Sequence, residues 1–480
     1  MQTAAIDDLR DWLEAVRAMD ELVDVSSADW NLEIGAVSQM SYRRADPSAV
    51  LFDDIPGYPS GFRVLTGSLS NARRMALTLR MGTDYDDARL VSELTGRPLE
   101  WEARAAEFDP HVVTDGPVFE NVIENNVDLL KFPAPLWNKG DGGRFIGTGC
   151  MVLTSDPVTG VINGGAYRMQ VQDGGRGVTV NPVPGKHGDQ HIRRWFEKEG
   201  RAPVTISLGH DPLLLLVAGT EVPTGMSELN FAGAIMGRPI DVATSEVTGL
   251  PIPVRSEIVI EGWLRPGERL PEGPFGEWTG YYSGSDAPVL SLDIARVLHR
   301  DNPILLGSPP GKPPHDYSYM RTVMKSAMIR DSLVKSGIPG VTGVWAHEAG
   351  GGRLLVTVAI DQQYCGHSRQ VGYITSQCQA AAYMNRFVVV VDDDVDPTKL
   401  DEIIWAMCTR CDPAEDIDIL RKTWGSKADP LLVDQSVPYN SRAVIDACRP
   451  FERLATFPAV AEVPPELMRR TEEKWAHLFR

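Results

Sequence analysis

The 480-residue sequence lacks an apolar run long enough to cross a membrane and lacks any long run of Lys and Arg. Its longest apolar run, from Leu213 to Gly219, is far shorter than the roughly 20 residues that a membrane-spanning helix needs. The N-terminus has no basic segment followed by an apolar one, so no signal peptide is expected. Acidic residues outnumber basic ones, 65 to 47, and the formal net charge of −18 repels nucleic acid and anionic membranes. We therefore expect a cytoplasmic protein that binds neither.

Cysteine is also scarce, with six residues scattered along the chain. Only Cys408 and Cys411 stand close together, in the order Cys-Thr-Arg-Cys. This spacing suits a redox or zinc pair, but no second cysteine pair or histidine stands nearby. We interpret the two residues as buried thiols near the end of a helix.

The first quarter of the sequence alternates between helical and strand-like patterns. Apolar residues at helical spacing predict an opening helix: Ile6, Leu9, Leu13 and Val16. Two short strands and two helices are then expected, at 50–52, 63–65, 71–81 and 88–96. Because 480 residues exceed the size of one ordinary hydrophobic core, we assign residues 1–115 to a separate N-terminal α/β domain.

Short strands dominate the middle of the sequence, and Gly and Pro turns separate them. The strand-like runs are 150–153, 177–180, 204–208, 213–217, 255–260, 289–292 and 304–306. One helix, at about 191–199, interrupts them. Many short strands with this punctuation predict a barrel or a sandwich, which we place at residues 116–315.

A long helical pattern from Tyr317 to Lys335, closed by Gly337, predicts a helix that links two domains, over residues 316–337. The order that follows is strand, helix, strand, helix, at 354–360, 368–384, 387–391 and 398–408. That order predicts an α/β domain with a parallel strand pair, over residues 338–460. We expect a last helix, within residues 461–480, to act as a partner-binding arm.

Two carboxylates, Glu272 and Glu277, flank the segment Gly-Pro-Phe-Gly. Gly and Pro rule out a regular helix here, so both carboxylates are expected on a turn. Two acids in one site can divide acid and base work when their surroundings separate their pKa values. An arginine beside one of them keeps that one ionised. From spacing alone, a solvated acidic turn is the alternative interpretation.

A second set of residues offers ligands for a hard divalent metal. Asn163, His191 and Glu228 supply an amide oxygen, an imidazole and a carboxylate. This mixed set suits Mn²⁺ or Mg²⁺ better than a structural zinc ion. Taken alone, His191 at a helix start is more often a surface or capping residue, and His187 is a weaker candidate. The acidic run from Asp392 to Asp396 is better explained as the end of a strand and the cap of a helix.

Several short motifs occur in a fixed order along the chain. They are Asn163 to Arg168, Gln190-His191 ahead of Trp195, Ser227-Glu228 with Phe231, Glu261-Gly with Glu272 to Glu277 and Gly280-Tyr-Tyr, and Trp405-Ala with Thr409-Arg410. In these motifs, and over nearly its whole length, the sequence resembles the UbiD-type decarboxylases, which depend on prenylated FMN. The resemblance implies that the central domain is a split β-barrel of the flavin-reductase type, within an overall α/β (α+β) architecture.

The resemblance also implies catalytic roles. Glu277 is then the proton donor, while Arg168 orients the substrate carboxylate and pairs with Glu272. The expected activity is a reversible, non-oxidative decarboxylation of an aromatic, heteroaromatic or α,β-unsaturated acid. Loss of CO₂ from such a carbon needs an electron sink, which the cofactor supplies.

The resemblance further implies a cofactor site with two cations. The cofactor-binding positions are Asn163, Ala166, Tyr167, Arg168, Gln190, His191 and Glu228. Three of these, Asn163, His191 and Glu228, match the ligands of a Mn²⁺ or Mg²⁺ ion that holds the cofactor phosphate. Gly164, Ala218 and Thr220 match positions that bind K⁺. Some members have a phosphate-binding lysine near the position of Gln379, so this chain departs from them there.

The sequence leaves the substrate open. His187 and Trp278 are expected to line its pocket, and a tryptophan there suggests a flat, conjugated acid. A flavin prenyltransferase is the expected source of the cofactor, and a homodimer or larger homo-oligomer is the expected assembly. Three alternatives remain: an FMN-dependent oxidoreductase, a metal-dependent hydrolase, and a cofactor-binding subunit without chemistry of its own.

Overall fold

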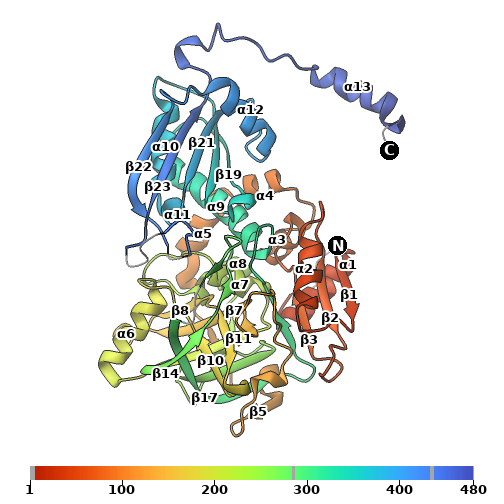
Figure 1. Cartoon of the computed structure of the whole chain (residues 1–480), viewed down its shortest axis with the longest axis vertical. Helices are drawn as coiled ribbons and strands as arrows, with labels where there is room; N and C mark the ends of the chain where they lie inside the picture. The colour runs from red at the N-terminus through yellow and green to blue at the C-terminus, as the bar shows by residue number, and fades with distance from the viewer. Residues whose placement is uncertain (1–5, 284–286, 427, 433–436, 479–480) are drawn as a thin grey trace.

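The computed structural model describes residues 6–283, 287–426, 428–432 and 437–478. It shows a mixed α/β chain in which a curled half-barrel sheet lies between two α/β domains (Figure 1). The predicted fold class is therefore confirmed. Within the described ranges, none of the helices is both long and apolar enough to cross a membrane.

The N-terminal domain packs helices against a four-stranded sheet. Its elements are α1 (Leu9–Ala18), β1 (Leu22–Ser26), α2 (Glu33–Tyr42), β2 (Ala49–Asp53), β3 (Arg63–Thr66), α3 (Ala72–Thr78), α4 (Asp87–Leu94) and α5 (Arg97–Arg104). The predicted opening helix begins after Asp8, whose side chain accepts hydrogen bonds from the first turn. The sheet order is β1-β2-β3-β18, and β18 (Ile304–Leu306) runs parallel to β3. The predicted strand at 304–306 thus belongs to the N-terminal sheet and not to the barrel.

The central domain is built on a nine-stranded sheet. Its elements are β4 (His111–Val112), β5 (Asn121–Ile123), β6 (Phe145–Gly147), β7 (Cys150–Ser155), β8 (Ile162–Gly165), β9 (Met169–Gln172), β10 (Gly177–Val180), α6 (His187–Glu199), β11 (Ala202–Leu208), α7 (Pro212–Ala218), α8 (Glu228–Met236), β12 (Asp241–Thr244), β13 (Pro251–Pro253), β14 (Ile258–Glu272), β15 (Phe275–Gly276), β16 (Tyr282–Ser283) and β17 (Ala287–His299). The order is β6-β9-β10-β17-β14-β11-β7-β8, with β5 beside β17. The long antiparallel pair of β14 and β17 forms the middle of this sheet.

One predicted strand in this region is wrong, because residues 213–217 form helix α7. Asp211 caps the helix by accepting a hydrogen bond from the Leu213 N–H at 2.9 Å, and Pro212 is its first residue. Aspartate followed by proline is a helix-start signal. The apolar run hides this signal, since a helix buried on all sides shows no periodicity.

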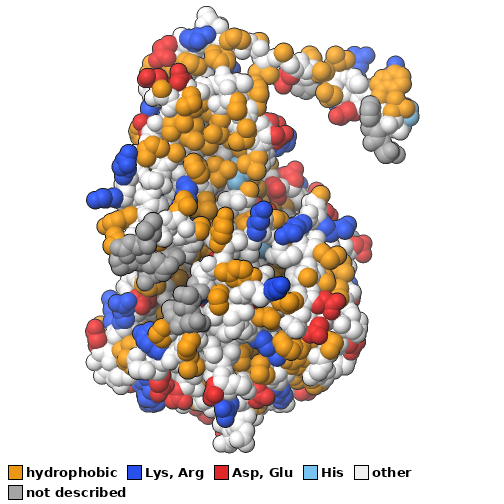
Figure 2. Space-filling model, in the orientation of Figure 1, with side chains coloured by type: hydrophobic (Ala, Val, Ile, Leu, Met, Phe, Trp, Pro, Cys, Tyr) orange, Lys and Arg blue, Asp and Glu red, His pale blue; other side chains and the backbone are white. Residues whose placement is uncertain are grey.

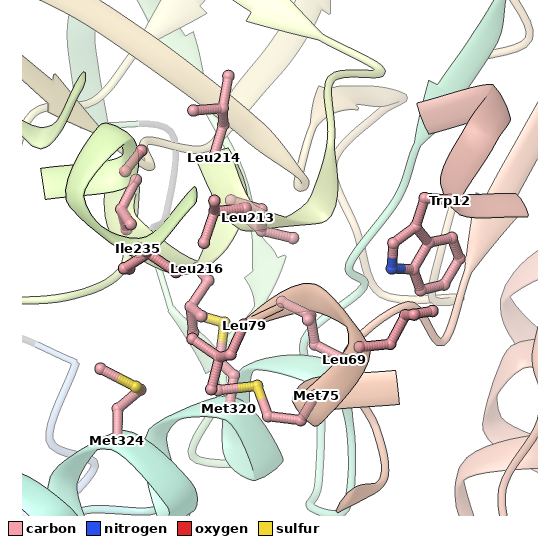
Figure 3. Packing of buried hydrophobic residues seen from close by; sticks show 14 of the residues in the cluster. Trp12, Leu69, Met75, Leu79, Leu213, Leu214, Leu216, Ile235, Met320 and Met324 are labelled. Atoms are coloured by element: carbon pink, nitrogen blue, oxygen red, sulfur yellow. The ribbon is translucent and has the colours of Figure 1, made fainter. Parts of the chain in front are cut away.

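Helix α7 contributes to the largest hydrophobic core, which joins the N-terminal domain to the linking helix α9 (Asp316–Lys335). Figure 3 shows Trp12 and Leu69 on one side of the cluster and Leu213 and Leu216 on the other, with Met320 and Met324 of α9 below them. Ile329 and Leu333, further along α9, belong to the core of the C-terminal domain. The linking helix is therefore fixed in two cores.

The C-terminal domain follows α9 and has a five-stranded sheet. Its elements are β19 (Val341–Ala346), β20 (Leu355–Ile360), α10 (His367–Gln377), α11 (Gln379–Ala382), β21 (Phe387–Asp392), α12 (Leu400–Arg410), β22 (Ile417–Trp424), β23 (Tyr439–Ala447) and α13 (Pro465–Trp475). Strands β20 and β21 are parallel, as predicted. The helix expected at 368–384 is interrupted at Cys378, so α10 and α11 are separate. Helix α13 lies apart from the rest of the chain (Figure 1).

Two side-chain groups in this domain have structural explanations. Asp392 ends β21, as predicted, and together with Asp394 it binds the buried Arg410 at 2.8–2.9 Å. Cys408 and Cys411 are free thiols at the end of α12. Cys408 is exposed and Cys411 is half-buried, so the expectation of two buried thiols is wrong for Cys408.

Candidate active site

Arg168 lies in the short connection between β8 and β9 and bridges two carboxylates. Its Nε donates to Glu272 Oε2 at 2.7 Å, and its Nη1 donates to Glu277 Oε1. The guanidinium carbon lies 5.3 Å from the centroid of the Phe275 ring. Burial lowers the pKa of Arg168, but the two carboxylates outweigh that effect and raise it above its usual value. The three residues that the motifs singled out therefore form one ion-pair network.

Glu272 is the last residue of β14, so it belongs to a strand end and not to the turn that the sequence predicted. Its side chain is fully buried. Besides Arg168, it accepts hydrogen bonds from Thr179 Oγ1 at 2.7 Å and from Asn181 Nδ2 at 2.9 Å. A buried carboxylate with three donors is held in one orientation.

Glu277 does lie on a turn, just beyond the short strand β15. Its backbone N–H donates to Tyr281 O at 2.9 Å, which closes the turn. Ser283 Oγ donates to the carboxylate at 2.7 Å, and Ser283 also accepts from Arg168 at 3.3 Å. The Glu277 side chain is 16% exposed, whereas that of Glu272 is 0% exposed. Of the two acids, Glu277 is the one that a ligand can reach.

The predicted metal ligands come from three elements, of which α6 and α8 both contact β8. Asn163 lies on β8, His191 on α6, and Glu228 at the first turn of α8, and all three are buried. Glu228 Oε2 accepts a hydrogen bond from the Gly164 N–H at 2.6 Å. A Cβ added at Gly188, one turn before His191, would lie 3.3 Å from Asn163 Nδ2.

These residues fit a divalent cation. Burial raises the pKa of Glu228 to about 8, and among the described residues no basic side chain pairs with it. The buried Asn163 Nδ2 has no hydrogen-bond partner within the described part of the chain. No group of three His, Cys, Asp or Glu side chains with metal-site spacing occurs among the described residues. The three predicted ligands include only two such side chains, His191 and Glu228, because the third, Asn163, is an amide.

The other predicted cofactor positions lie close in sequence to Asn163 or His191. The Ala166 N–H donates to Ala218 O at 3.1 Å, which joins β8 and its following loop to the end of α7. Tyr167 is buried, and burial raises the pKa of its hydroxyl. Gln190 is exposed, and its side chain donates to Gly185 O at 3.0 Å. The predicted K⁺ positions are similarly engaged, since Thr220 Oγ1 donates to Leu216 O at 2.8 Å.

The two expected pocket residues lie in different surroundings. His187 Nε2 is 3.1 Å from Thr224 Oγ1, and burial, followed by the charge of Lys186, lowers its pKa. Trp278 follows Glu277 and packs against helix α9, where its ring centroid is 5.4 Å from the guanidinium carbon of Arg321. Sequence reasoning missed Thr179, Asn181 and Ser283, which hold the two carboxylates. Isolated polar residues on strands or just beyond them give no pattern that would identify them.

Comparison with protein families supports these observations. The chain matches three domain models of one family in order: the 3-octaprenyl-4-hydroxybenzoate carboxy-lyase N-terminal domain over residues 13–94, the Rift-related domain over 111–313 and the C-terminal domain over 318–447.

Individual proteins match over nearly their full lengths. The chain is 30% identical to a phenolic acid decarboxylase of Bacillus subtilis, with 93% of each chain covered. It is 29% identical to a pyrrole-2-carboxylic acid decarboxylase of Pseudomonas aeruginosa, over 98% of this chain and 97% of the other. The UbiD-class enzyme HmfF from Pelotomaculum thermopropionicum, solved in complex with FMN, superposes with a TM-score of 0.84 at 26% identity, over 96% of this chain and 98% of that one. An evolved dimeric form of HmfF in complex with prFMN gives a TM-score of 0.80 at 25% identity, over 97% and 98%.

Proposed function

Because the chain belongs to the UbiD family of carboxy-lyases, we propose that it reversibly removes CO₂ from an aromatic, heteroaromatic or α,β-unsaturated acid. It is a carboxy-lyase that depends on prenylated FMN. The reaction is non-oxidative, since a carboxylate is exchanged for a proton. The observation that carries the assignment of the site is Arg168, whose guanidinium group holds Glu272 and Glu277 together.

In this proposal the three residues have separate roles. Glu272 is buried and held by three donors, so it fixes the orientation of Arg168. Arg168 orients the substrate carboxylate by donating a hydrogen bond from Nη1 to it in place of the one to Glu277. Glu277 is partly exposed and lies on a turn, and it delivers a proton to the carbon that has lost CO₂. In the carboxylation direction Glu277 takes that proton back.

Prenylated FMN, when bound, would supply the electron sink that this chemistry needs. Asn163, His191 and Glu228 would hold Mn²⁺ or Mg²⁺, whose charge would offset that of the cofactor phosphate. A buried carboxylate without a basic partner supports this role, because a cation would supply the missing charge. Backbone groups around Gly164 and Ala218, with Thr220, provide oxygen ligands for K⁺. Ala166, Tyr167 and Gln190 complete the proposed cofactor site, while His187 and Trp278 line the proposed substrate pocket.

We also propose that a flavin prenyltransferase supplies the cofactor and that the chain forms a homodimer or larger assembly. The C-terminal domain supports the proposed assembly because it exposes large apolar side chains, among them Ile404, Trp405, Ile419 and Trp424. Hydrophobic side chains gather over this part of the molecule in the space-filling view (Figure 2). Apolar patches of this kind mark association surfaces.

The function is tested with protein co-expressed with a flavin prenyltransferase. The absorption spectrum and the mass of the released cofactor identify the flavin, and CO₂ release is then measured across a panel of aryl, heteroaryl and acrylic acids. We expect prenylated FMN and turnover of at least one conjugated acid. Unmodified FMN with hydride-transfer activity would favour the oxidoreductase, whereas bound prenylated FMN without CO₂ release from any acid would favour the non-catalytic subunit. A colourless protein that hydrolyses substrates only with metal would favour the hydrolase.

A further inference from the structure

A short loop, residues 138–142, lies against the turn that carries Glu277, the proposed proton donor. Three hydrogen bonds join the two segments, and each is donated by a backbone N–H: Gly276 to Asp141 Oδ1 at 2.9 Å, Gly142 to Pro274 O at 2.7 Å, and Gly140 to Tyr282 Oη at 2.9 Å. The first two involve residues of the turn that precede Glu277, and the third involves a residue that follows it. The loop therefore holds both arms of the turn.

The loop and the turn touch through glycine residues. A Cβ added at Gly142 would lie 1.8 Å from Gly273 O, and a Cβ added at Gly276 would lie 2.8 Å from Asn138 Nδ2. Contacts this short leave no room for a side chain, which is why glycine is needed where two backbones approach closely. Because the two segments are in direct contact, a displacement of the loop also displaces the turn.

Asp141 accepts hydrogen bonds from two backbone donors at once. Its Oδ1 accepts from the Gly276 N–H, and its Oδ2 accepts from the Asn138 N–H at 2.8 Å, which closes the loop. A carboxylate supplies both acceptors, whereas the amide of asparagine has only one oxygen. Burial raises the pKa of Asp141, although these hydrogen bonds and the charge of Arg168 partly offset that effect. Asp141 thus links the loop to the residue that directly precedes Glu277.

Gln170 connects the same loop and turn to the strand that follows Arg168. It lies on β9, two residues after Arg168. Its Oε1 accepts from the Gly273 N–H at 2.8 Å, and its Nε2 donates to Gly142 O at 3.0 Å. Gly273 directly follows Glu272 in the sequence. The segments that carry the three residues of the ion-pair network are therefore hydrogen-bonded to one another.

We propose that Asp141 is a positioning residue, which acts through the turn to keep the Glu277 carboxylate within reach of the carbon that loses CO₂. A general acid must lie within hydrogen-bonding reach of the atom that receives its proton. A displacement of about 1 Å can lower a rate roughly 100-fold. Asp141 does not touch the substrate in this inference, since backbone donors occupy both of its oxygens. The inference rests on the proposed decarboxylase function, with Glu277 as the proton donor.

The first test measures the turnover of cofactor-loaded Asp141→Ala and Asp141→Asn. Asp141→Ala removes both acceptors, and we expect kcat to fall roughly 10- to 100-fold. Asp141→Asn keeps one acceptor, so its kcat should lie between the wild-type and alanine values. Asp53→Ala is the control, because Asp53 Oδ1 accepts from the Gly61 N–H at 2.8 Å in the N-terminal domain. A wild-type kcat in both Asp141 variants, or an equal loss in Asp53→Ala, overturns the inference.

A double variant distinguishes positioning from a general loss of structure. Asp141→Ala is added to Glu277→Gln, which has no acid left to position. We expect the added change to lower the residual kcat by less than about twofold, because two residues that act through one step give losses that do not add. Losses that multiply would show that Asp141 acts independently of Glu277 and would overturn the inference.

Substrate binding gives a readout that does not depend on turnover. The acid with the highest turnover is titrated by calorimetry into flavin-loaded Glu277→Gln protein, with and without Asp141→Ala. The Kd should change by less than about twofold, because Arg168 stays paired with Glu272. A clear rise in Kd, or a loss of bound flavin, would mean that Asp141 builds the binding site as a whole, and would overturn the inference. If Asp141→Ala does not fold, the same measurements on Asp141→Asn decide.

Failure of the inference and failure of the proposed function give different results. If the wild-type protein releases no CO₂ from any acid of the panel, the proposed function fails, and the role of Asp141 fails with it. The inference alone fails when the wild type is active and Glu277→Gln is impaired, but the Asp141 variants turn over as the wild type does.

Discussion

Replacing Glu277 with glutamine separates its role in catalysis from its role in folding. The Glu277 carboxylate accepts hydrogen bonds from Arg168 and from Ser283 Oγ, the latter at 2.7 Å. Glutamine has nearly the same volume and keeps an oxygen acceptor, but it has no acidic proton and no charge. The weakened ion pair should cost about 1.5–3 kcal/mol of unfolding free energy at most, the value of one hydrogen bond to a charged group. Arg168 stays paired with Glu272, so its positive charge is still balanced by one carboxylate in the variant.

Turnover should fall much further, by roughly 10² to 10⁴, the usual contribution of a general acid. Such a loss corresponds to about 2.7–5.4 kcal/mol of activation free energy, at 1.36 kcal/mol per factor of ten. The assay follows CO₂ release from cofactor-loaded protein, alongside flavin content and the thermal midpoint. Glu268→Gln, at an exposed position on β14, is the matched control and should behave as wild type. Turnover of the Glu277→Gln variant within tenfold of wild type would refute the assignment of Glu277 as the proton donor.

Three further outcomes are expected. Arg168→Lys should lower both substrate affinity and turnover because an ammonium group cannot span two carboxylates as the planar guanidinium does, and unchanged steady-state kinetics would make Arg168 purely structural. Glu228→Ala should release flavin and manganese together, so full occupancy of both, measured per chain by absorbance and metal analysis, would place the anchor elsewhere. Stability should decrease below pH 6.5, because burial lowers the pKa of His210 and His347 to about 4 while unfolded histidine takes up its proton at about 6.5. Between pH 6.5 and 5, each of these two histidines should lower the free energy of unfolding by about 2 kcal/mol. Calorimetry at several pH values measures this change, and a His210→Gln variant with the wild-type pH dependence would contradict the assignment to His210.

Much of the fold could be predicted from local pattern. Helix α1 has clear apolar periodicity, the long helix α9 is followed by Gly337 as a stop signal, and the alternation after α9 predicted a parallel strand pair. Helix α7 was missed because its side chains are buried on every side, which removes the polar face that gives a helix its period. The pairing of β18 with β3 was missed for a different reason. No feature of a three-residue strand predicts which strand, some 240 residues away, it will pair with.

Part of the candidate site could likewise be predicted from the sequence, and part could not. Arg168, Glu272 and Glu277 could be selected because motifs around them are dense and ordered, and the structure places them in contact. The basic side chains around Glu221, which are Lys186, Arg321, Lys325 and Arg353, could not be selected, because they stand in separate segments of the sequence with no shared motif. Charge from distant segments becomes visible only when the fold brings it to one carboxylate.

The position of β18 in the N-terminal sheet has a consequence for how the chain is made. Strand β3 ends at Thr66, but its parallel neighbour begins only at Ile304. The hydrophobic core beneath that sheet likewise includes Leu213 and Met320. At about 5–20 residues per second, a ribosome spends about 12–50 s between the two strands. During that time the first hundred residues have neither their last strand nor their full core, so they remain dependent on chaperones or on their own solubility. A fragment cut near residue 115 should therefore fail to fold alone, and the N-terminal domain should become protease-resistant only after the barrel has left the ribosome.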